Sequence, residues 1–307
     1  MYDVAVIGAG PAGLTSAIYT CRYGLKTVIF EDPTNPSQLS LAPKIENYPG
    51  FEGNGLELLT KMKKQAEKFG AIVRVERVVD ILREGNYFEI VTDEEEYQAK
   101  ALIFAIGCKH RELGVEGEKE FVGRGVSYCA VCDGFFFKGK KVLVVGGGNT
   151  ALVDALYLHD LGCDVTIVHR RDKFRADKIL QDRVFEKGIN VIWNSVVTRI
   201  EGDEMVRKVV LKDVRTRKEI EIEVDGVFVA VGVVPNTELA KKLGVELDDK
   251  GYIKVDRYQR TNIEGVFACG DCCDNPLKQV ITACGDGARA GYSAYDFISK
   301  KFYHEVR

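Results

Sequence analysis

The chain contains a long internal repeat, since residues 3–32 align on residues 141–170 without a gap. Nine of the thirty aligned pairs are identical, and the two copies are offset by 138 residues. Each copy has an apolar strand, a glycine turn, a helix with apolar periodicity, a glycine stop and a second apolar strand. This order predicts a βαβ unit of about 30 residues, the setting that a dinucleotide fingerprint requires. Because the period is too long for a solenoid, the repeat predicts two Rossmann-type α/β domains.

Length and composition agree with two soluble domains. The chain has 307 residues, and a domain usually has about 150. Its 43 Lys and Arg residues against 46 Asp and Glu residues leave a net charge of −3, which argues against nucleic-acid and membrane-surface partners. No apolar run approaches the roughly 18 residues of a membrane span, and the N-terminus has no basic region typical of a signal peptide. We therefore expect a cytoplasmic protein.

The first copy carries a glycine fingerprint made of Gly8, Gly10 and Gly13, with Pro11 and Ala12 between the last two. In such a motif the first glycine permits a tight turn, the second lets the backbone approach a pyrophosphate, and the third packs the helix on the strand. The pyrophosphate then binds the free N–H groups at the helix N-terminus. Glu31 ends the second strand, where a carboxylate accepts hydrogen bonds from a ribose diol.

The second copy differs at both of these places. Its turn contains the small or polar residues Gly146, Gly148, Asn149, Thr150 and Ala151. Its second strand ends in a basic segment, with His169 in the place of Glu31, followed by Arg170, Arg171 and Arg175. Guanidinium groups bind a phosphate through charge-assisted hydrogen bonds, whereas a carboxylate repels one. The two sites therefore predict FAD at the first copy and NADPH, with its 2′-phosphate, at the second.

A pair of cysteines lies just before the second repeat, in the order Cys129-Ala130-Val131-Cys132-Asp133. Two cysteines at this spacing can form a small disulfide that exchanges with external disulfides. Asp133 disfavours a neighbouring thiolate, so its useful role is to transfer a proton to or from a departing sulfur. The alternatives are half of a zinc site or two inert buried thiols.

The remaining cysteines bear on the zinc alternative. The chain has nine cysteines, an odd number that argues against a complete disulfide framework. A zinc site needs four ligands, and Cys269-x-x-Cys272, followed by Cys273, offers a second pair. Cys269, however, ends an apolar strand that enters Gly270-Asp271. We expect packing roles for these three and for Cys284, and no metal.

Together, the first fingerprint, the Cys-Ala-Val-Cys-Asp motif, the second turn and the His-Arg-Arg-x-x-x-Arg segment resemble the low-molecular-weight thioredoxin reductases. These are the class II pyridine nucleotide-disulfide oxidoreductases. The similarity covers nearly the whole chain, including residues 45–50, 123–128 and 265–271. In the larger disulfide reductases the redox cysteines closely follow the first fingerprint, whereas here they precede the second.

The resemblance implies that an NADPH domain, residues 113–245, is inserted into an FAD domain formed by residues 1–112 and 246–307. Asp271 matches the aspartate that binds the flavin ribityl chain, and Gln279 matches the glutamine of an Arg-Gln-Ala flavin contact. The other flavin-binding residues that it implies are Gln38, Asn47, Lys278 and Val280.

The resemblance also implies a mechanism. Hydride passes from NADPH to FAD, and the electron pair then reaches the disulfide of Cys129 and Cys132. Cys132 faces the flavin, Cys129 attacks the disulfide of the partner, and Asp133 carries the proton. The partner is thioredoxin, a glutaredoxin-like protein or a protein disulfide oxidoreductase. Family members are homodimers in which the inserted domain swings.

Three segments depart from the family pattern. The usual Gly-Gly-Gln before the flavin is Pro36-Ser37-Gln38, the Ala-Thr-Gly turn has Ile106 in place of threonine, and the Arg-Gln-Ala contact is Lys278-Gln279-Val280. These departures bear on the hydrogen bonding and the potential of the flavin. Two rival interpretations of the chain also stay open. One is a dithiol oxidase or reductase of the same fold with another donor or acceptor, and the other is a regulatory protein that binds zinc and a nucleotide. The complete basic segment favours NADPH.

Overall fold

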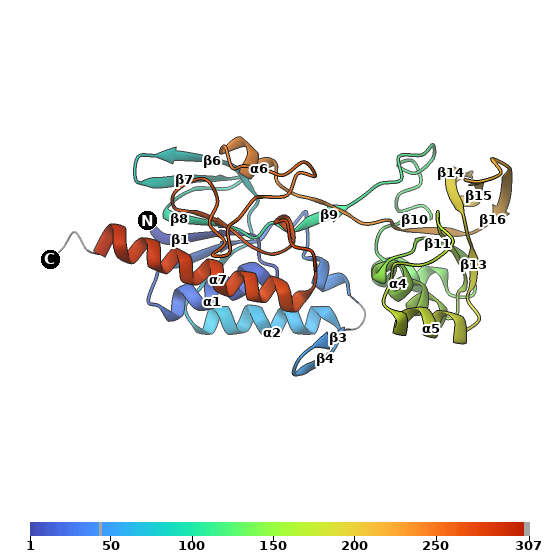
Figure 1. Cartoon of the computed structure of the whole chain (residues 1–307), viewed down its shortest axis with the longest axis horizontal. Coiled ribbons are helices and arrows are strands. Elements are labelled where there is room, and N and C mark those ends of the chain that lie inside the picture. Colours follow the sequence, from blue (N-terminus) through green and yellow to red (C-terminus); the bar gives the residue numbers. More distant parts are fainter. Residues whose placement is uncertain (43–44, 304–307) are drawn as a thin grey trace. The chain divides into compact units, whose positions relative to one another are not determined.

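The chain forms two compact units, one inserted into the sequence of the other (Figure 1). The computed structural model describes residues 1–42 and 45–303, apart from the side chains of Leu41, Glu46, Cys132 and Tyr303. Unit 1 comprises Met1–Lys109 with Pro235–Arg307, and unit 2 comprises His110–Val234. Each unit has a parallel sheet with helices, which confirms the predicted α/β fold class.

A parallel sheet in the order β5-β2-β1-β8 forms the centre of unit 1. β19 pairs with the end of β8, while β7 and β6 extend the sheet from the beginning of β8 as antiparallel strands. The strands are β1 (Tyr2–Ile7), β2 (Thr27–Phe30), β5 (Ile72–Arg74), β6 (Val78–Glu84), β7 (Tyr87–Thr92), β8 (Glu96–Phe104) and β19 (Val266–Ala268). Because parallel strands end at the same edge of a sheet, the segments that follow β1 and β19 meet there.

Both faces of this sheet are covered. The helices α1 (Pro11–Arg22), α2 (Gly55–Lys68) and α7 (Val280–Ile298) cover one face (Figure 1). Val4 and Val6 of β1 point into the core on that side, and Ala5 into the core on the other side, as strand periodicity requires. The second core includes Ala240 of α6 (Glu238–Lys242) and Val245. Residues 235–245 therefore belong to unit 1, whereas the family resemblance implies a domain boundary at 245/246.

The shorter elements of unit 1 lie in the segments that connect its strands and helices. They are the 3₁₀ turns η1 (Gln38–Leu41) and η3 (Gly270–Cys272), the hairpin of β3 (Ile45–Tyr48) and β4 (Phe51–Gly53), and η4 (Ser299–Tyr303). The two segments by which the chain passes between the units pair with each other, as β9 (Cys108–His110) and β18 (Val233–Pro235). In the part of the chain that the structure describes, no helix has the length and apolarity needed to cross a membrane.

Unit 2 has a five-stranded parallel sheet in the order β10-β17-β11-β12-β13. Its strands are β10 (Val126–Ser127), β11 (Lys141–Gly146), β12 (Asp164–Val168), β13 (Asn190–Ile192) and β17 (Gly226–Ala230). Val142 and Val144 pack on the helices α4 (Asn149–Asp160) and α5 (Lys178–Glu186). Leu143 and Val145 face the other core, with the antiparallel strands β14 (Ser195–Gly202), β15 (Val206–Asp213) and β16 (Glu219–Glu223).

Candidate functional site

The turn after β1 has the conformation that the first fingerprint predicts. Gly8 has a φ of +110°, and a Cβ atom there would lie 2.3 Å from the carbonyl oxygen of Ala105. A Cβ atom at Gly13 would lie 1.9 Å from the carbonyl oxygen of Gly8. Gly10 is the N-cap of α1 and supplies no side chain to cap the first N–H groups, and Pro11 follows at the start of the helix. These N–H groups are open to an anion such as a pyrophosphate.

Glu31, just beyond the end of β2, is half-buried. Its Oε2 lies 2.5 Å from the Nζ of Lys63 on α2, and its own N–H donates to the carbonyl of Arg74. A carboxylate has about four acceptor positions, so the ion pair leaves capacity for the hydroxyl groups of a ribose. The contact with Lys63 places the carboxylate on the helical side of the sheet. The strand end lies beside the turn, because the N–H of Gly8 donates to the carbonyl of Phe30 over 2.9 Å.

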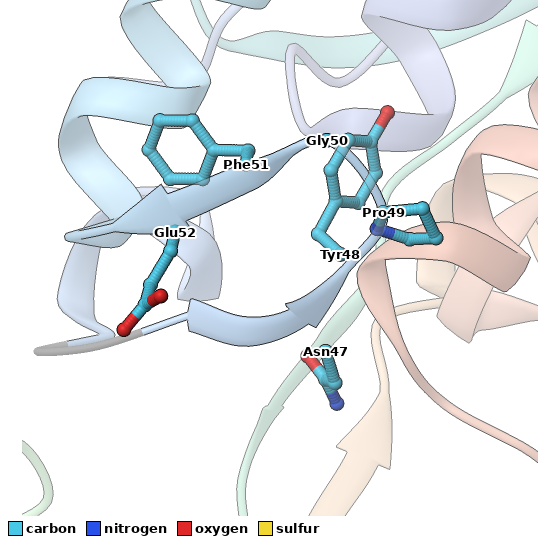
Figure 2. Close-up of a pocket in the computed structure, with 6 residues that line it drawn as sticks. All are labelled: Asn47, Tyr48, Pro49, Gly50, Phe51 and Glu52. Atoms are coloured by element: carbon cyan, nitrogen blue, oxygen red, sulfur yellow. The ribbon is translucent and has the colours of Figure 1, made fainter.

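Two residues from distant segments meet beside the same edge of the unit 1 sheet. The Nδ2 of Asn47, in β3, donates to the Oε1 of Gln279 over 2.9 Å. Gln279 is the N-cap of α7, where it forms a capping box with Thr282. Asn47 also lines a shallow pocket of about 510 Å³ along the β3–β4 hairpin, with Tyr48, Pro49, Gly50, Phe51 and Glu52 (Figure 2). Val280 follows as the first residue of α7.

Lys278 also contacts Asp271, but its side chain bonds the main-chain carbonyl of Asp271 and not the carboxylate. The Nζ of Lys278 donates to the carbonyl oxygens of Asp271 (2.9 Å) and Cys273 (3.1 Å), and it lies 4.0 Å from the ring centre of Tyr252. Burial raises the pKa of the Asp271 carboxyl, and the Lys278 ammonium opposes that shift. Lys278 therefore stabilises the η3 turn that carries Asp271.

Gln38, the first residue of η1, is bonded to the end of unit 1's first segment and not to another predicted flavin residue. Its Nε2 donates to the carbonyl of Cys108 over 3.0 Å. Cys108 is buried, and its thiol donates to the carbonyl of Asp271 over 3.1 Å. Gln38 is therefore connected through Cys108 to the η3 turn.

The glycine turn of unit 2 also leaves an open helix N-terminus. A Cβ atom at Gly146 would lie 2.3 Å from the carbonyl oxygen of Ala230, whereas one at Gly148 would meet no atom within 4 Å. Gly148 is the N-cap of α4 and supplies no capping side chain. The space above this helix terminus fits a phosphate group. Thr150 is exposed in the first turn of α4, and Ala151 is buried.

Asn149, the first residue of α4, is bound to the segment that follows the basic residues. Its Nδ2 donates to the Oδ2 of Asp177 and its Oδ1 accepts from the N–H of Asp177, both over 2.8 Å. Asp177 is the N-cap residue of α5. This pair joins the glycine turn to the end of the basic segment.

The basic segment after β12 folds back on the glycine turn. The N–H of Arg175 donates to the carbonyl of Gly147 over 2.8 Å, and a Cβ atom at Gly147 would lie 2.3 Å from the Nδ1 of His169. The side chains of Arg170, Arg171 and Arg175 are exposed, and within the described residues none forms an ion pair. Three guanidinium groups are thus available to an anion beside the turn.

His169 is buried at the end of β12, and no described residue bonds its Nε2. Its ring centre lies 5.9 Å from that of Phe174 and 6.2 Å from that of Trp193. Burial, followed by the positive charge of Arg175, lowers the pKa of His169. An unpartnered buried nitrogen beside three arginines fits a site completed by a ligand.

Cys129 is disulfide-bonded and lies between β10 and the short helix α3 (Ala130–Asp133). The side chain of Cys132 lies outside the described residues, so its pairing with Cys129 stays a prediction. Asp133 is the last residue of α3, is half-buried, and donates its N–H to the carbonyl of Cys129 over 3.2 Å. The redox motif thus forms one tight turn at the β10 edge of the unit 2 sheet.

The other seven cysteines are free thiols. Cys269, Cys272 and Cys273 are almost completely buried around η3, and burial raises the pKa of Cys269 well above its ordinary value. Across the residues that the structure describes, no group of three or more His, Cys, Asp or Glu side chains is arranged to hold a metal ion. The buried positions of Cys269, Cys272 and Cys273 are those expected of packing residues.

Two aromatic residues beside the redox motif were not predicted from the sequence. Phe135 and Phe136 lie in η2 (Gly134–Phe137) and are 70% and 69% exposed, with ring centres 6.4 Å apart. The signal that could have identified them is a run of aromatic residues directly after Asp133 and Gly134. An exposed aromatic pair next to a disulfide is typical of a protein-binding surface.

Comparison with known proteins gives consistent similarities over nearly the whole chain. The family model described as "Pyridine nucleotide-disulphide oxidoreductase" matches residues 2–287. The thioredoxin reductase of Listeria monocytogenes is 45% identical over 304 residues, covering 98% of this chain and 95% of that protein. The thioredoxin reductase of Bacillus subtilis is 43% identical over 303 residues, covering 98% and 96%. A crystal structure of Lactococcus lactis thioredoxin reductase in its FR conformation has a TM-score of 0.94 and 44% identity, and the match covers 98% of this chain and 100% of that one.

Proposed function

This chain belongs to the pyridine nucleotide-disulphide oxidoreductase family, and on that premise we propose that it is the flavoprotein that reduces the disulfide of a thioredoxin-like protein with electrons from NADPH. The resemblance to thioredoxin reductases inferred from the motifs is confirmed. The observation that most directly supports this proposal is the disulfide of Cys129. It lies in the same unit as the second glycine turn and the basic segment.

FAD and NADPH are the cofactors of this family's thioredoxin reductases, and both predicted sites fit them. Two glycine turns end at helix N-termini that no side chain caps, and only the second turn has three exposed arginines beside it. We assign FAD to unit 1, with Glu31 on the ribose and Asp271 on the ribityl chain. We assign NADPH to unit 2, with Arg170, Arg171 and Arg175 on the 2′-phosphate. When bound, the two cofactors supply hydride transfer and deliver an electron pair to the disulfide.

Within the redox motif, Cys132 accepts the electron pair and Cys129 attacks the disulfide of the partner, which gives a mixed disulfide between the two proteins. Attack by Cys132 on that mixed disulfide releases the reduced partner and restores the intramolecular disulfide. Asp133 gives a proton to the departing sulfur and receives one back, since a half-buried carboxylate next to the motif is suited to that transfer.

The partner is a protein rather than a small disulfide, because Phe135 and Phe136 expose a large aromatic surface beside the motif. Burial of such rings is a major source of affinity in protein interfaces. On this proposal, the partner presents an apolar surface next to its own disulfide that covers them. We further propose that the chain acts as a homodimer in the cytoplasm, as the family resemblance implies.

Replacement of each redox cysteine tests the function. The Cys132→Ser variant is expected to remain yellow and to be reduced by NADPH in an anaerobic stopped-flow mixing experiment, with no turnover of thioredoxin. Cys129→Ser is expected to lose turnover as well. Cys21→Ser, which removes a free thiol of unit 1, serves as the control and should retain turnover. Thioredoxin turnover by Cys132→Ser would contradict the proposed function.

A further inference from the structure

Ser127, the last residue of β10, makes two hydrogen bonds to the main chain of Cys129. The N–H of Cys129 donates to the Oγ of Ser127 over 3.0 Å, and that hydroxyl donates to the carbonyl of Cys129 over 3.1 Å. A hydroxyl has one donor and two acceptor positions, so one side chain satisfies both groups. Ser127 is only 4% exposed, which protects these bonds from competition with water.

Ser127 and the residue that follows it are each bonded to another part of unit 2. Ser127 pairs with Phe228 in the parallel ladder of β10 and β17. The hydroxyl of the next residue, Tyr128, donates to the Oε1 of Glu118 over 2.8 Å. Glu118 is 1% exposed and also accepts the N–H groups of Leu113 and Gly114. The bonds of Ser127 therefore connect Cys129 to a fixed frame.

A buried serine that closes a local turn is common, and in most places it only stabilises the fold. The residue that Ser127 holds is different, because Cys129 changes its covalent state. Reduction of its disulfide breaks one S–S bond and adds two electrons and two protons, which gives two thiols. The cross-link restrains Cys129 in the oxidised form. In the reduced form, that restraint is gone and the main-chain bonds remain.

We propose that Ser127 is a positioning residue that holds the main chain of Cys129 in place when the disulfide is open. This inference rests on the proposed function, since it requires a reducible disulfide at Cys129. A fixed main chain keeps the sulfur of Cys129 near the second thiol of the motif and so favours closure of the disulfide. Loss of the hydroxyl frees the reduced form more than the oxidised form. It therefore makes the disulfide easier to reduce.

The test is a redox titration of the holoenzyme. The protein is equilibrated with mixtures of reduced and oxidised dithiothreitol, in which formation of two protein thiols converts one reduced reagent molecule into its disulfide. Thiols are trapped with iodoacetamide in denaturant and counted by mass spectrometry. For Ser127→Ala, we expect the equilibrium constant to shift about five- to tenfold towards the dithiol, because the lost bonds act in both forms and only the larger loss in the reduced form changes the equilibrium.

Matched variants separate positioning from folding. Ser127→Thr keeps the hydroxyl, and its equilibrium constant is expected to lie within about twofold of that of the parent protein. Ser127→Val has the shape of the threonine variant without the hydroxyl, and its equilibrium constant should shift like that of Ser127→Ala. The Thr and Val pair keeps the test valid if the smaller side chain destabilises β10. Ser195→Ala is the control, because Ser195 is a buried serine of the same unit whose hydroxyl donates to the carbonyl of Trp193 over 3.0 Å. It should leave the equilibrium constant unchanged.

Two different results would count against these ideas. A parent-like equilibrium constant in both Ser127→Ala and Ser127→Val, or an equal shift in Ser195→Ala, would overturn the role of Ser127. If dithiothreitol reduces no disulfide at Cys129 in the parent protein, the proposed function is overturned instead. The parent titration distinguishes the two before any variant is compared.

Discussion

The side chain of Asn47 donates a 2.9 Å hydrogen bond to the side chain of Gln279, although the two residues are 232 positions apart. The bond joins the β3–β4 hairpin (Figure 2) to the N-terminus of α7. Both residues belong to segments in which we expect flavin contacts. The hairpin and the start of α7 are therefore positioned together before either contacts a cofactor.

Loss of this bond is expected to weaken FAD binding. Asn47→Ala and Gln279→Ala should each raise the dissociation constant of FAD about tenfold, because each removes one partner of a hydrogen bond that fixes two flavin-flanking segments. In the double variant the losses should not add, since the bond is shared. FAD fluorescence on titration of the apoprotein measures the constants, with the exposed Gln98→Ala as the control. Additive effects would show that the two side chains act separately.

Discrimination between NADPH and NADH should depend on the arginines of the basic segment. Arg170→Ala and Arg175→Ala are expected to raise the KM for NADPH about 10- to 100-fold, because each removes charge-assisted hydrogen bonds to the 2′-phosphate. The KM for NADH should stay the same. Arg207→Ala, an exposed arginine elsewhere in unit 2, is the control for net charge. Equal effects on both nucleotides would place the 2′-phosphate elsewhere.

Substitutions at Gly147 and Gly148 of the second turn should have different effects. Gly148→Ala adds a methyl group where there is open space, so the melting temperature should stay within about 2 °C while NADPH affinity falls at least tenfold. Gly147→Ala places a Cβ atom 2.3 Å from the Nδ1 of His169, so it should destabilise unit 2. Thermal denaturation and nucleotide titration measure both effects. Unchanged NADPH affinity in Gly148→Ala would contradict the assigned pyrophosphate position.

Protonation of His169 should destabilise the protein at acidic pH. Burial and Arg175 lower its pKa below the ordinary 6.5, so the unfolded chain binds more protons than the folded protein in this range. The stability contributed by neutral His169 is complete above 6.5 and is lost as the pH falls towards the lowered pKa. Asp154, whose pKa burial raises to about 7, acts in the opposite direction.

Comparing the parent protein with a histidine variant separates the contribution of His169 from those of Asp154 and other groups. The melting temperature of the parent protein should fall more steeply with decreasing pH than that of His169→Asn, over about pH 7.5 to pH 5. The two curves should approach each other at the acidic end, because the variant has no imidazole to protonate. Parallel curves would show that His169 does not titrate in this range.

The exposed aromatic pair should determine affinity for the protein partner. Phe135→Ser and Phe136→Ser are expected to raise the KM for a thioredoxin about tenfold each, since each removes a large apolar contact. The rate of flavin reduction by NADPH should not change. Val122→Ser, which also removes an exposed apolar side chain of unit 2, is the control. A slower flavin reduction in the phenylalanine variants would show that they act on the nucleotide step.

Much of the architecture could be predicted from local patterns. The glycine turns, the helices that follow them and the parallel strands around them depend on residues within about 30 positions, and the structure has them where the repeat predicts. The contrast between Glu31 and His169 likewise required only an alignment of the chain with itself. The boundary at Pro235 was less predictable, because it depends on the packing of Ala240 and Val245 against a sheet formed mostly by the first hundred residues.

The sequence alone determined which residues can hold a dinucleotide, because backbone conformation and charge at a turn are local properties. Only the tertiary structure decided what each side chain bonds. Asn149 is paired with Asp177, Lys278 is bonded to the η3 carbonyls, and Ser127 holds the main chain of Cys129. The first two contacts depend on how separate turns approach one another at a sheet edge. The third spans only three residues, and the pairing of Ser127 with Phe228 in the β10–β17 ladder adds a tertiary restraint to it.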